Sequence, residues 1–180
     1  MDLHPKRLEA CHPLVTAKGM EFLHHANAVG HKLLVVRSWS DFEEQMEIYK
    51  VGRTYNAATK EWEETGAVRT KAKPGTSAHN IITGDKAPAS LAFDVIPIDS
   101  NGVPLWQVVD ETPPQNELRW LRLYGRGQKA VWEELYKTAA RCGLDAYGDT
   151  WGAYLAWDKG HFEEPRWQLA LEPLGLTQGL

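Results

Sequence analysis

The sequence predicts one domain of the α+β class, in which helices and short strands follow one another without regular alternation. The chain has 180 residues, which is enough for one hydrophobic core. Hydrophobic residues make up 43% and charged residues 24% of it, as in an ordinary globular protein. We find no internal repeat, low-complexity tract or linker, so we expect a single domain over residues 1–180.

The first part of the chain predicts a helix followed by a buried strand. A helix is indicated over residues 13–29, and Gly30 is suited to end it. The apolar positions that indicate it are Leu14, Ala17, Phe22 and Ala26. Residues 32–36 read Lys-Leu-Leu-Val-Val, a short, branched and apolar run that is typical of a buried strand.

A second helix is predicted just after this strand. Ser40 and Glu43 have the spacing of a capping box, so we expect the helix to run to about Val51, with Gly52 ending it. Residues 53–90 are rich in Gly, Pro, Thr and Lys, and their pattern assigns them to no element. Long irregular segments of compact domains are often functional.

The rest of the chain predicts one more long helix and several short elements. Residues 92–98 are apolar and predict a strand. An amphipathic pattern predicts a helix over residues 128–141, which Gly143 closes. Near the end we predict short extended segments over residues 161–163 and 167–171.

Composition argues against several classes of partner. The formal net charge of -4 argues against nucleic acid, whose phosphates demand a basic surface. No run of about 18 apolar residues is present, so we expect no membrane insertion, and the N-terminal residues do not have the pattern of a secretory signal. Cys11 and Cys142 are too few for a disulfide framework, which favours two free thiols in a reducing compartment.

The seven histidines fall into two groups. We interpret five of them as surface side chains: His4, His12, His24, His25 and His31. His79 follows a Gly-Thr-Ser turn and His161 opens a short predicted strand, so each can be aimed at a site. Neutral imidazole is a ligand that zinc accepts.

Asp94 stands inside the apolar run of residues 91–96, where an unpaired charge would be expensive to bury. A divalent cation would serve as its partner. An ion pair with Arg or Lys, or a side chain that faces solvent, are the alternatives. With His79 and His161, Asp94 would provide three protein ligands and leave a fourth position for water, as in hydrolytic zinc sites.

Two further residues could take part in hydrolysis. Asp158 precedes His161 by three residues, which in a turn or helix places both side chains on one face. It is either a general base or a solvated turn residue. Arg37 ends the first predicted strand, where a guanidinium can stabilise an oxyanion or hold a substrate carboxylate. A surface salt bridge is the alternative for Arg37.

Three ordered motifs resemble the zinc peptidases of the D-alanyl-D-alanine carboxypeptidase and VanX/VanY type, which include phage endolysins that cut L-alanyl-D-glutamate bonds. Residues 77–79 (Ser-Ala-His) and 92–94 (Ala-Phe-Asp) are similar to the two ends of that family's Ser-x-His-x-x-Gly-x-Ala-x-Asp motif. Residues 158–163 (Asp-Lys-Gly-His-Phe-Glu) are similar to its acidic-x-x-His motif. The upstream Arg-Ser…Gln…Tyr…Gly-Arg pattern is matched by Arg37, Ser38, Gln45, Tyr49, Gly52 and Arg53.

The chain departs from the family in the first of these motifs. Fourteen residues lie between His79 and Asp94, whereas the family places its His and Asp close together. Residues 80–91 therefore resemble an insertion, and Asp85 is a competing ligand. We prefer Asp94, because Ala-x-Asp-Val on a strand fits the end of the motif and Asp85 sits in a turn-like Gly-Asp-Lys.

The resemblance implies a small antiparallel sheet flanked by helices, as in the Hedgehog and D-Ala-D-Ala peptidase fold. It implies that His79, Asp94 and His161 hold one zinc ion. Asp158 would act as the general base and later protonate the leaving amine, and Arg37 would stabilise the developing oxyanion.

Supporting roles are also implied by the resemblance. Ser77 would contact the substrate, and Gln45 would support the site from behind the ligands. The implied partner is a peptidoglycan stem peptide, with no nucleic acid, and we expect a monomer without a separate wall-binding domain.

The implied activity is hydrolysis of a stem-peptide bond, with L-alanyl-D-glutamate as our first choice and D-Ala-D-Ala carboxypeptidase activity as the alternative. We expect a phage lysis enzyme that stays in the bacterial cytoplasm until it is released to the periplasm and cell wall. Two other interpretations are a non-catalytic zinc-containing wall-binding module and a structural phage protein with an incidental motif.

Overall fold

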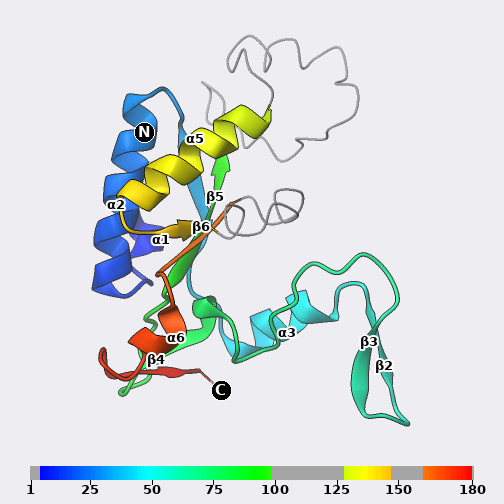
Figure 1. Ribbon diagram of the computed structural model, residues 1–180. Helices are drawn as coiled ribbons and strands as arrows, with labels where there is room; N and C mark the ends of the chain where they lie inside the picture. Colours follow the sequence, from blue (N-terminus) through cyan, green and yellow to red (C-terminus); the bar gives the residue numbers. More distant parts are fainter. Residues whose placement is uncertain (1–4, 99–127, 147–159, 180) are drawn as a thin grey trace.

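The computed structural model describes residues 5–98, 128–146 and 160–179, and its centre is a four-stranded antiparallel sheet (Figure 1). The strand order is β1-β5-β7-β6. The strands are β1 (Leu33–Arg37), β5 (Ala92–Pro97), β6 (Asp145–Ala146) and β7 (His161–Glu163). The three strands predicted over residues 32–36, 92–98 and 161–163 are therefore confirmed, and the sheet joins segments that are far apart in the sequence.

Helices α2 (Pro13–Ala28) and α5 (Gln128–Arg141) pack against each other, and α2 also contacts the sheet (Figure 1). Both helices were predicted. The buried residues of α2 are Val15, Gly19, Phe22 and Ala26. Leu14 and Ala17, two of the four predicted apolar positions, are exposed, so the buried stripe is centred differently from the prediction.

Three fully buried phenylalanines join α2 to the sheet. The ring of Phe22 lies 6.3 Å from the ring of Phe93 in β5 and 4.7 Å from the ring of Phe162 in β7, measured between centroids. Phe93 and Phe162 stand opposite each other in the antiparallel register. Because side chains alternate between the two faces of a strand, the neighbouring residues Asp94 and His161 point to the opposite face.

Helix α3 (Phe42–Lys50) confirms the helix predicted after residue 40, but the predicted cap is wrong by one residue. Asp41 is the N-cap, and its carboxylate accepts a hydrogen bond of 2.7 Å from the backbone N–H of Glu44. Ser40 is fully buried, and its hydroxyl accepts a hydrogen bond from Arg37 instead. Ser and Asp are comparable caps, so local sequence does not decide between them.

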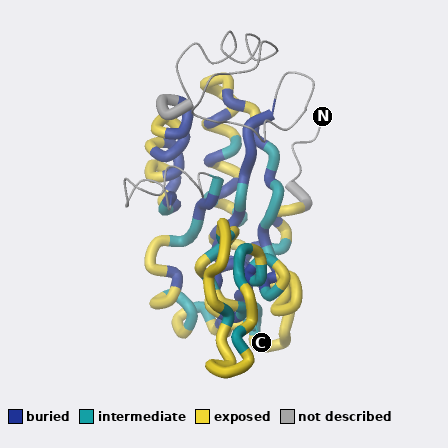
Figure 2. Tube along the Cα trace, turned by 90° about the vertical axis from the view of Figure 1, so that its right-hand side faces the viewer, coloured by how far each residue is buried: buried dark blue, intermediate teal, exposed yellow. Residues whose placement is uncertain are grey.

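Part of the unassigned segment forms a hairpin, which we call the arm, from β2 (Arg53–Asn56) and β3 (Glu61–Glu64). The arm extends away from the sheet (Figure 1) and is mostly exposed (Figure 2). Arg53 fixes its base by donating to the carbonyls of Tyr49 at 2.6 Å and Thr70 at 2.9 Å. Its residues are mainly polar and charged, so the usual apolar alternation of a strand was missing.

Residues 80–91 contain a second hairpin-like turn. It begins at the 3-10 helix η1 (Ala78–Asn80) and continues through β4 (Ile81–Thr83), which pairs with β8 (Leu176–Gln178) near the C-terminus. Two backbone hydrogen bonds close the excursion, from Ala89 to Ile81 and from Leu91 to Ala78, each at 3.0 Å. The chain thus leaves and returns at the same place, next to η1.

The C-terminal segment differs from its prediction. The extended conformation predicted over residues 167–171 is wrong, because α6 (Trp167–Ala170) is a short helix. Trp167 is buried while Leu169 is 71% exposed. A further short helix, α1 (Pro5–Leu8), stands at the start of the described chain.

His31 contradicts the surface interpretation, since it is 7% exposed and its Nε2 lies 3.0 Å from the carboxylate of Glu134. His12 is the N-cap of α2, and His4 lies outside the described residues. Cys11 and Cys142 are both buried, free thiols. Within the described ranges, no helix has the length and apolar character needed to cross a bilayer.

Candidate metal centre

A row of polar side chains crosses the sheet on the face opposite the phenylalanines. In the antiparallel register, Asp94 of β5 stands opposite both Arg37 of β1 and His161 of β7. The register shifts between Val35 and Arg37, as at a β-bulge. Bulges re-aim side chains and are frequent next to active sites. Strand pairing therefore brings three of the predicted site residues together.

His79 joins this row from η1, which Ser77 caps. The Ser77 hydroxyl accepts a hydrogen bond of 3.3 Å from the backbone N–H of His79. His79 is 2% exposed, and its Nδ1 donates a hydrogen bond to the backbone carbonyl of Ser38. Because a carbonyl can only accept, Nδ1 of His79 carries a proton, so in the neutral ring the lone pair is on Nε2.

His79, Asp94 and His161, which we call the sheet trio, direct three ligand atoms to one point. Oδ1 of Asp94 lies 3.2 Å from Nε2 of His79 and 3.0 Å from Nδ1 of His161. The two nitrogens are 3.2 Å apart. Ligand atoms of a tetrahedral zinc ion, with bonds of about 2.1 Å, are about 3.4 Å apart. The sheet trio therefore has nearly the spacing that zinc requires.

The outer nitrogen of His161 is also occupied. Its Nε2 lies 3.0 Å from a carboxylate oxygen of Glu163 and donates to it, so in the neutral ring the lone pair is on Nδ1. Metal-binding histidines usually donate their other N–H to a carboxylate or a backbone carbonyl, as His161 and His79 do here. With these tautomers the three inward atoms are all acceptors, and a cation between them would satisfy all three.

Asp94 has the ionisation state that a ligand needs. Burial raises the pKa of its carboxyl group, but when the imidazoles of His79 and His161 are charged, their attraction and the hydrogen bonds they donate outweigh burial and hold that pKa well below its usual range. Asp94 is thus a carboxylate, with two nitrogens already beside it.

Arg37 is held in place beside the sheet trio. Its Nε donates to the hydroxyl of Ser40 at 2.8 Å, and its Nη2 donates to the side-chain oxygen of Gln45 at 2.5 Å. Gln45 is fully buried and donates in turn to the carbonyl of Ala72 at 2.9 Å. Among the described residues, Nη1 makes no hydrogen bond, which leaves that nitrogen for a ligand.

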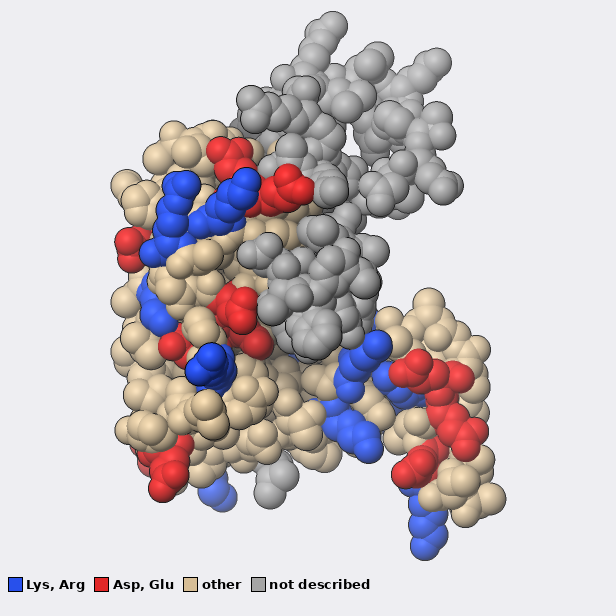
Figure 3. All heavy atoms as spheres, viewed as in Figure 1, with Lys and Arg blue, Asp and Glu red and all other residues tan. Residues whose placement is uncertain are grey.

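The sheet trio opens onto a cleft of about 550 Å³, a volume that can admit part of a peptide. Arg37 and Ser77 line it, together with Arg69 and Lys71 from the segment that follows the arm. Lys and Arg side chains gather around the region of α3, whereas acidic side chains stand on the arm (Figure 3). Acidic side chains of Glu44, Asp94 and Glu163 line the same cleft, so it presents both signs of charge to a ligand.

The two other acidic residues considered above, Asp158 and Asp85, have different outcomes. Asp158, the predicted general base, lies outside the described residues, as do residues 103–127. Asp85, the competing ligand, is exposed on the turn after β4, where a hydrogen bond from Thr83 lowers its pKa. The structure thus places Asp94, and not Asp85, with His79 and His161.

The sequence analysis assigned no role to Glu163, Asn80 or Gly160. Glu163 and His161 are two residues apart on a strand, so the alternation of side chains was the available signal. Asn80 is 1% exposed and donates to the carbonyl of Ser40 at 2.8 Å, which ties η1 to the end of β1. A Cβ at Gly160 would lie 2.3 Å from the carbonyl oxygen of Val95, so only glycine allows this approach of the chain to β5.

Comparison with known proteins identifies the fold. No protein-family model matches the chain, and no curated protein matches its sequence. A variant of the vancomycin-resistance D,D-pentapeptidase VanY from a VanB-type cassette, in complex with Zn(II), has a TM-score of 0.51 and 17% identity, covering 90% of this chain and 76% of that one.

Two further solved structures are similar at lower TM-scores. The LD-carboxypeptidase LdcB has a TM-score of 0.49 and 17% identity, with coverage of 93% of this chain and 66% of that chain. VanYB in complex with D-alanine-D-alanine has a TM-score of 0.46 and 17% identity, with coverage of 87% and 72%. The likeness to VanY confirms the predicted α+β class: this chain has the VanY-like fold of small antiparallel sheets and helices.

Proposed function

We propose that this chain is a zinc-dependent peptidase that hydrolyses a bond in the stem peptide of peptidoglycan. The observation that carries the proposal is the convergence of three acceptor atoms from His79, Asp94 and His161 beside a positioned Arg37 in one cleft. The fold supports it, since the similar VanY structure contains Zn(II). The motifs around these residues resemble those of peptidoglycan peptidases.

The sheet trio would hold the ion, which when bound supplies a Lewis acid for a peptide carbonyl and for the attacking water. Arg37, fixed by Ser40 and Gln45, would donate from Nη1 to the oxygen on which negative charge develops. Asp158 is the proposed base, from its motif position three residues before His161. Ser77 lines the cleft and is proposed to contact the substrate.

The proposed bond is L-alanyl-D-glutamate, because the ordered motifs resemble those of phage endolysins with that activity. Carboxypeptidase action on a terminal D-alanine is the second candidate, and the likeness to the D,D-pentapeptidase VanY favours it. A non-catalytic wall-binding module would have no use for an arginine held by Ser40 and Gln45 beside the metal ligands.

Elemental analysis together with a lysis assay tests the general proposal. Purified protein should contain one zinc ion in the sheet trio and should lower the turbidity of bacterial cells stripped of their outer membrane. Protein that has no zinc after purification and takes up none when zinc is added would overturn the proposal.

Mass spectrometry of digested muropeptides tests the choice of bond. The endopeptidase proposal expects products cut between L-alanine and D-glutamate. Release of terminal D-alanine alone would reject it in favour of the carboxypeptidase.

We also propose that the protein is a phage lysis enzyme that collects in the host cytoplasm before reaching the wall. Fractionation of infected cells tests this proposal. The protein should stay with the cytoplasmic fraction until a membrane pore opens, and its recovery from the periplasm of intact cells would contradict the proposal.

A further inference from the structure

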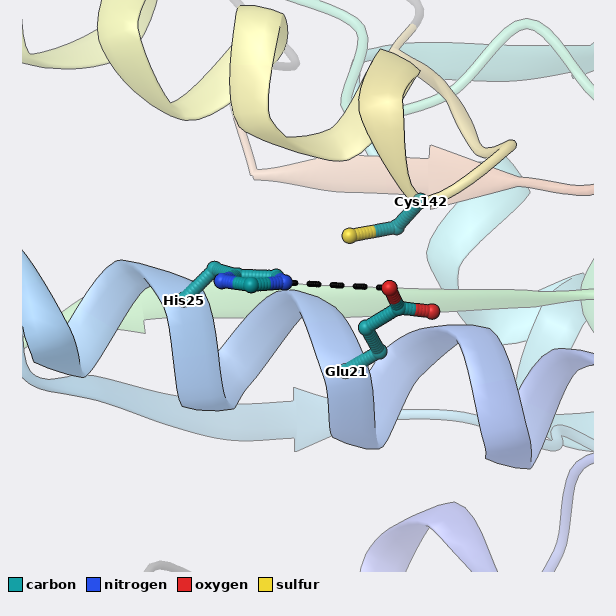
Figure 4. Close-up of side chains that lie close together, drawn as sticks. All are labelled: Glu21, His25 and Cys142. Carbon is teal, nitrogen blue, oxygen red and sulfur yellow. Dashed lines mark ion pairs between the residues drawn. The ribbon is translucent and has the colours of Figure 1, made fainter.

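A second group of metal-ligating side chains lies away from the cleft, where α2 meets the end of α5 (Figure 4). It consists of Glu21, His25 and Cys142, which we call the helix trio. Their ligand atoms all lie within 4.8 Å of one another, and Nε2 of His25 is 3.7 Å from a carboxylate oxygen of Glu21. Figure 4 shows the thiol and the carboxylate both turned toward the imidazole.

The backbone places these three residues together. Glu21 and His25 are four residues apart on α2, so they share one face of the helix. Cys142 follows the last residue of α5, where its N–H bonds to the carbonyl of Ala139 at 3.0 Å. Lys18 of α2 donates to the carbonyl of Gly143 at 2.9 Å, which ties this turn to the same helix.

The geometry can reach that of a zinc site by small rotations of side chains. Tetrahedral zinc with thiolate, imidazole and carboxylate ligands places the ligand atoms about 3.4–3.6 Å apart. The side chains of His25 and Glu21 are 54% and 58% exposed, so they can turn toward the buried sulfur of Cys142. Three ligands from two elements are enough, with water completing the coordination.

The ligand chemistry selects the class of metal. Thiolate and imidazole favour zinc and other thiophilic divalent ions over magnesium and calcium, which prefer oxygen ligands. Lys18, which donates to the turn that carries Cys142, is paired with Glu164 at 2.6 Å. Without a metal, burial and the charge of Glu21 raise the pKa of the Cys142 thiol, so binding would replace the thiol proton by the ion.

We propose that Glu21, His25 and Cys142 form a second metal site, for zinc or a similar thiophilic divalent cation, which clamps α2 to the turn after α5. On binding, the S–H bond of Cys142 breaks, a sulfur–metal bond forms and the proton leaves to solvent. The site requires no peptidase activity and is independent of the sheet trio.

Titration of the metal-free full-length protein with Co²⁺ tests this proposal. A cobalt–thiolate bond gives a charge-transfer absorption in the near ultraviolet, which the sheet trio cannot give because it contains no sulfur. We expect this absorption in the wild-type protein and in His161→Ala, with loss of the band in Cys142→Ser. Wild-type protein that binds Co²⁺ without the band would overturn the proposal.

Two controls keep the test decisive. Cys11→Ser should retain the band, because burial raises the pKa of the Cys11 thiol to about 12 and keeps it protonated. His25→Ala changes a side chain that is 54% exposed. It should weaken the Co²⁺ affinity measured from the charge-transfer band by at least ~10-fold. A band that persists in Cys142→Ser would mean that another sulfur binds the ion, and it would reject the proposal. Unchanged Co²⁺ affinity in His25→Ala would mean that His25 is not a ligand, and it would also reject the proposal.

Discussion

The sheet trio and the helix trio offer similar ligand types, but their surroundings differ. In the sheet trio, His79 and His161 are buried, and each donates its outer N–H to a second residue that fixes the ring. In the helix trio, His25 and Glu21 are exposed and only Cys142 is buried. The first group is organised before any ion arrives, whereas the second must be organised by the ion.

This difference separates a site suited to catalysis from one suited to binding alone. A catalytic site needs its ligands and charged groups fixed in advance, because reorganisation during the reaction raises the barrier. The sheet trio also has Arg37 beside it and a cleft in front of it. The helix trio instead joins α2 to the turn after α5 through two exposed side chains and one buried thiol, so we expect its ion to affect stability rather than the rate of hydrolysis.

The largest effect should come from removing the carboxylate of the sheet trio. Asp94→Ala takes away the ligand atom that lies within 3.2 Å of both imidazole nitrogens, so the protein should lose its catalytic zinc. Lysis activity should fall at least as far as the about 10²–10⁴-fold typical of a lost acid–base group. Elemental analysis in a Cys142→Ser background, where the helix trio lacks its sulfur ligand, and turbidity assays measure the two effects.

Asp85→Ala is the matched control, since Asp85 is exposed on the turn after β4. It should keep both zinc and activity. Loss of zinc in Asp85→Ala with retention in Asp94→Ala would assign the ligand to Asp85 instead.

Asp158→Ala should have the next largest effect, on activity alone. Removal of a general base lowers the rate by about 10²–10⁴-fold, while the three ligands stay in place. Steady-state kinetics on a soluble muropeptide measures the loss of rate, and zinc content measured on the same preparation shows whether the ligands still hold the ion. Unchanged kinetics would remove Asp158 from the mechanism.

Arg37→Ala should lower kcat by about 10²–10³-fold, the loss expected for one donor to a developing oxyanion, with zinc content unchanged. Arg37→Lys sharpens this prediction. Lysine keeps the positive charge, but its ammonium group cannot donate to both Ser40 and Gln45 with the planar geometry of a guanidinium. Arg37→Lys should therefore be little more active than Arg37→Ala. Full activity in Arg37→Lys would mean that charge alone is required.

The smallest of these effects should come from Glu163→Ala. Losing the acceptor for Nε2 of His161 should weaken zinc binding by about 10–100-fold. Competition with a chelator measures the affinity. Glu164→Ala is the control, because Glu164 pairs with Lys18 and not with His161. Equal weakening in both variants would argue against a specific role for Glu163.

Sequence patterns were sufficient to predict the elements whose apolar residues recur with the period of a helix or a strand. Helices α2, α3 and α5 and strands β1, β5 and β7 were all predicted, because each has an apolar pattern or a clear end signal. The arm was missed because Arg53–Asn56 and Glu61–Glu64 contain only one aromatic residue each, Tyr55 and Trp62, which is too few to show an apolar alternation. The helix at Trp167–Ala170 was predicted as extended, since four residues are too few to show a helical period.

Contacts between distant segments could not be predicted from spacing alone. Buried His31 contacts Glu134 of α5, and the helix trio includes Cys142, which follows that helix. Glu21 lies one turn before His25 on α2, but the third member of the trio is remote in the sequence. Likewise, fourteen residues between His79 and Asp94 suggested separation, but the turn through β4 returns the chain to η1.

Anomalous diffraction at the zinc edge, from crystals of the wild-type protein, tests the central claim most directly. The account predicts a zinc peak about 2.0–2.2 Å from Nε2 of His79, Nδ1 of His161 and a carboxylate oxygen of Asp94. These are the nitrogens that the hydrogen bonds to Ser38 and Glu163 leave without a proton. A zinc-loaded crystal with no peak between these three atoms would contradict the account.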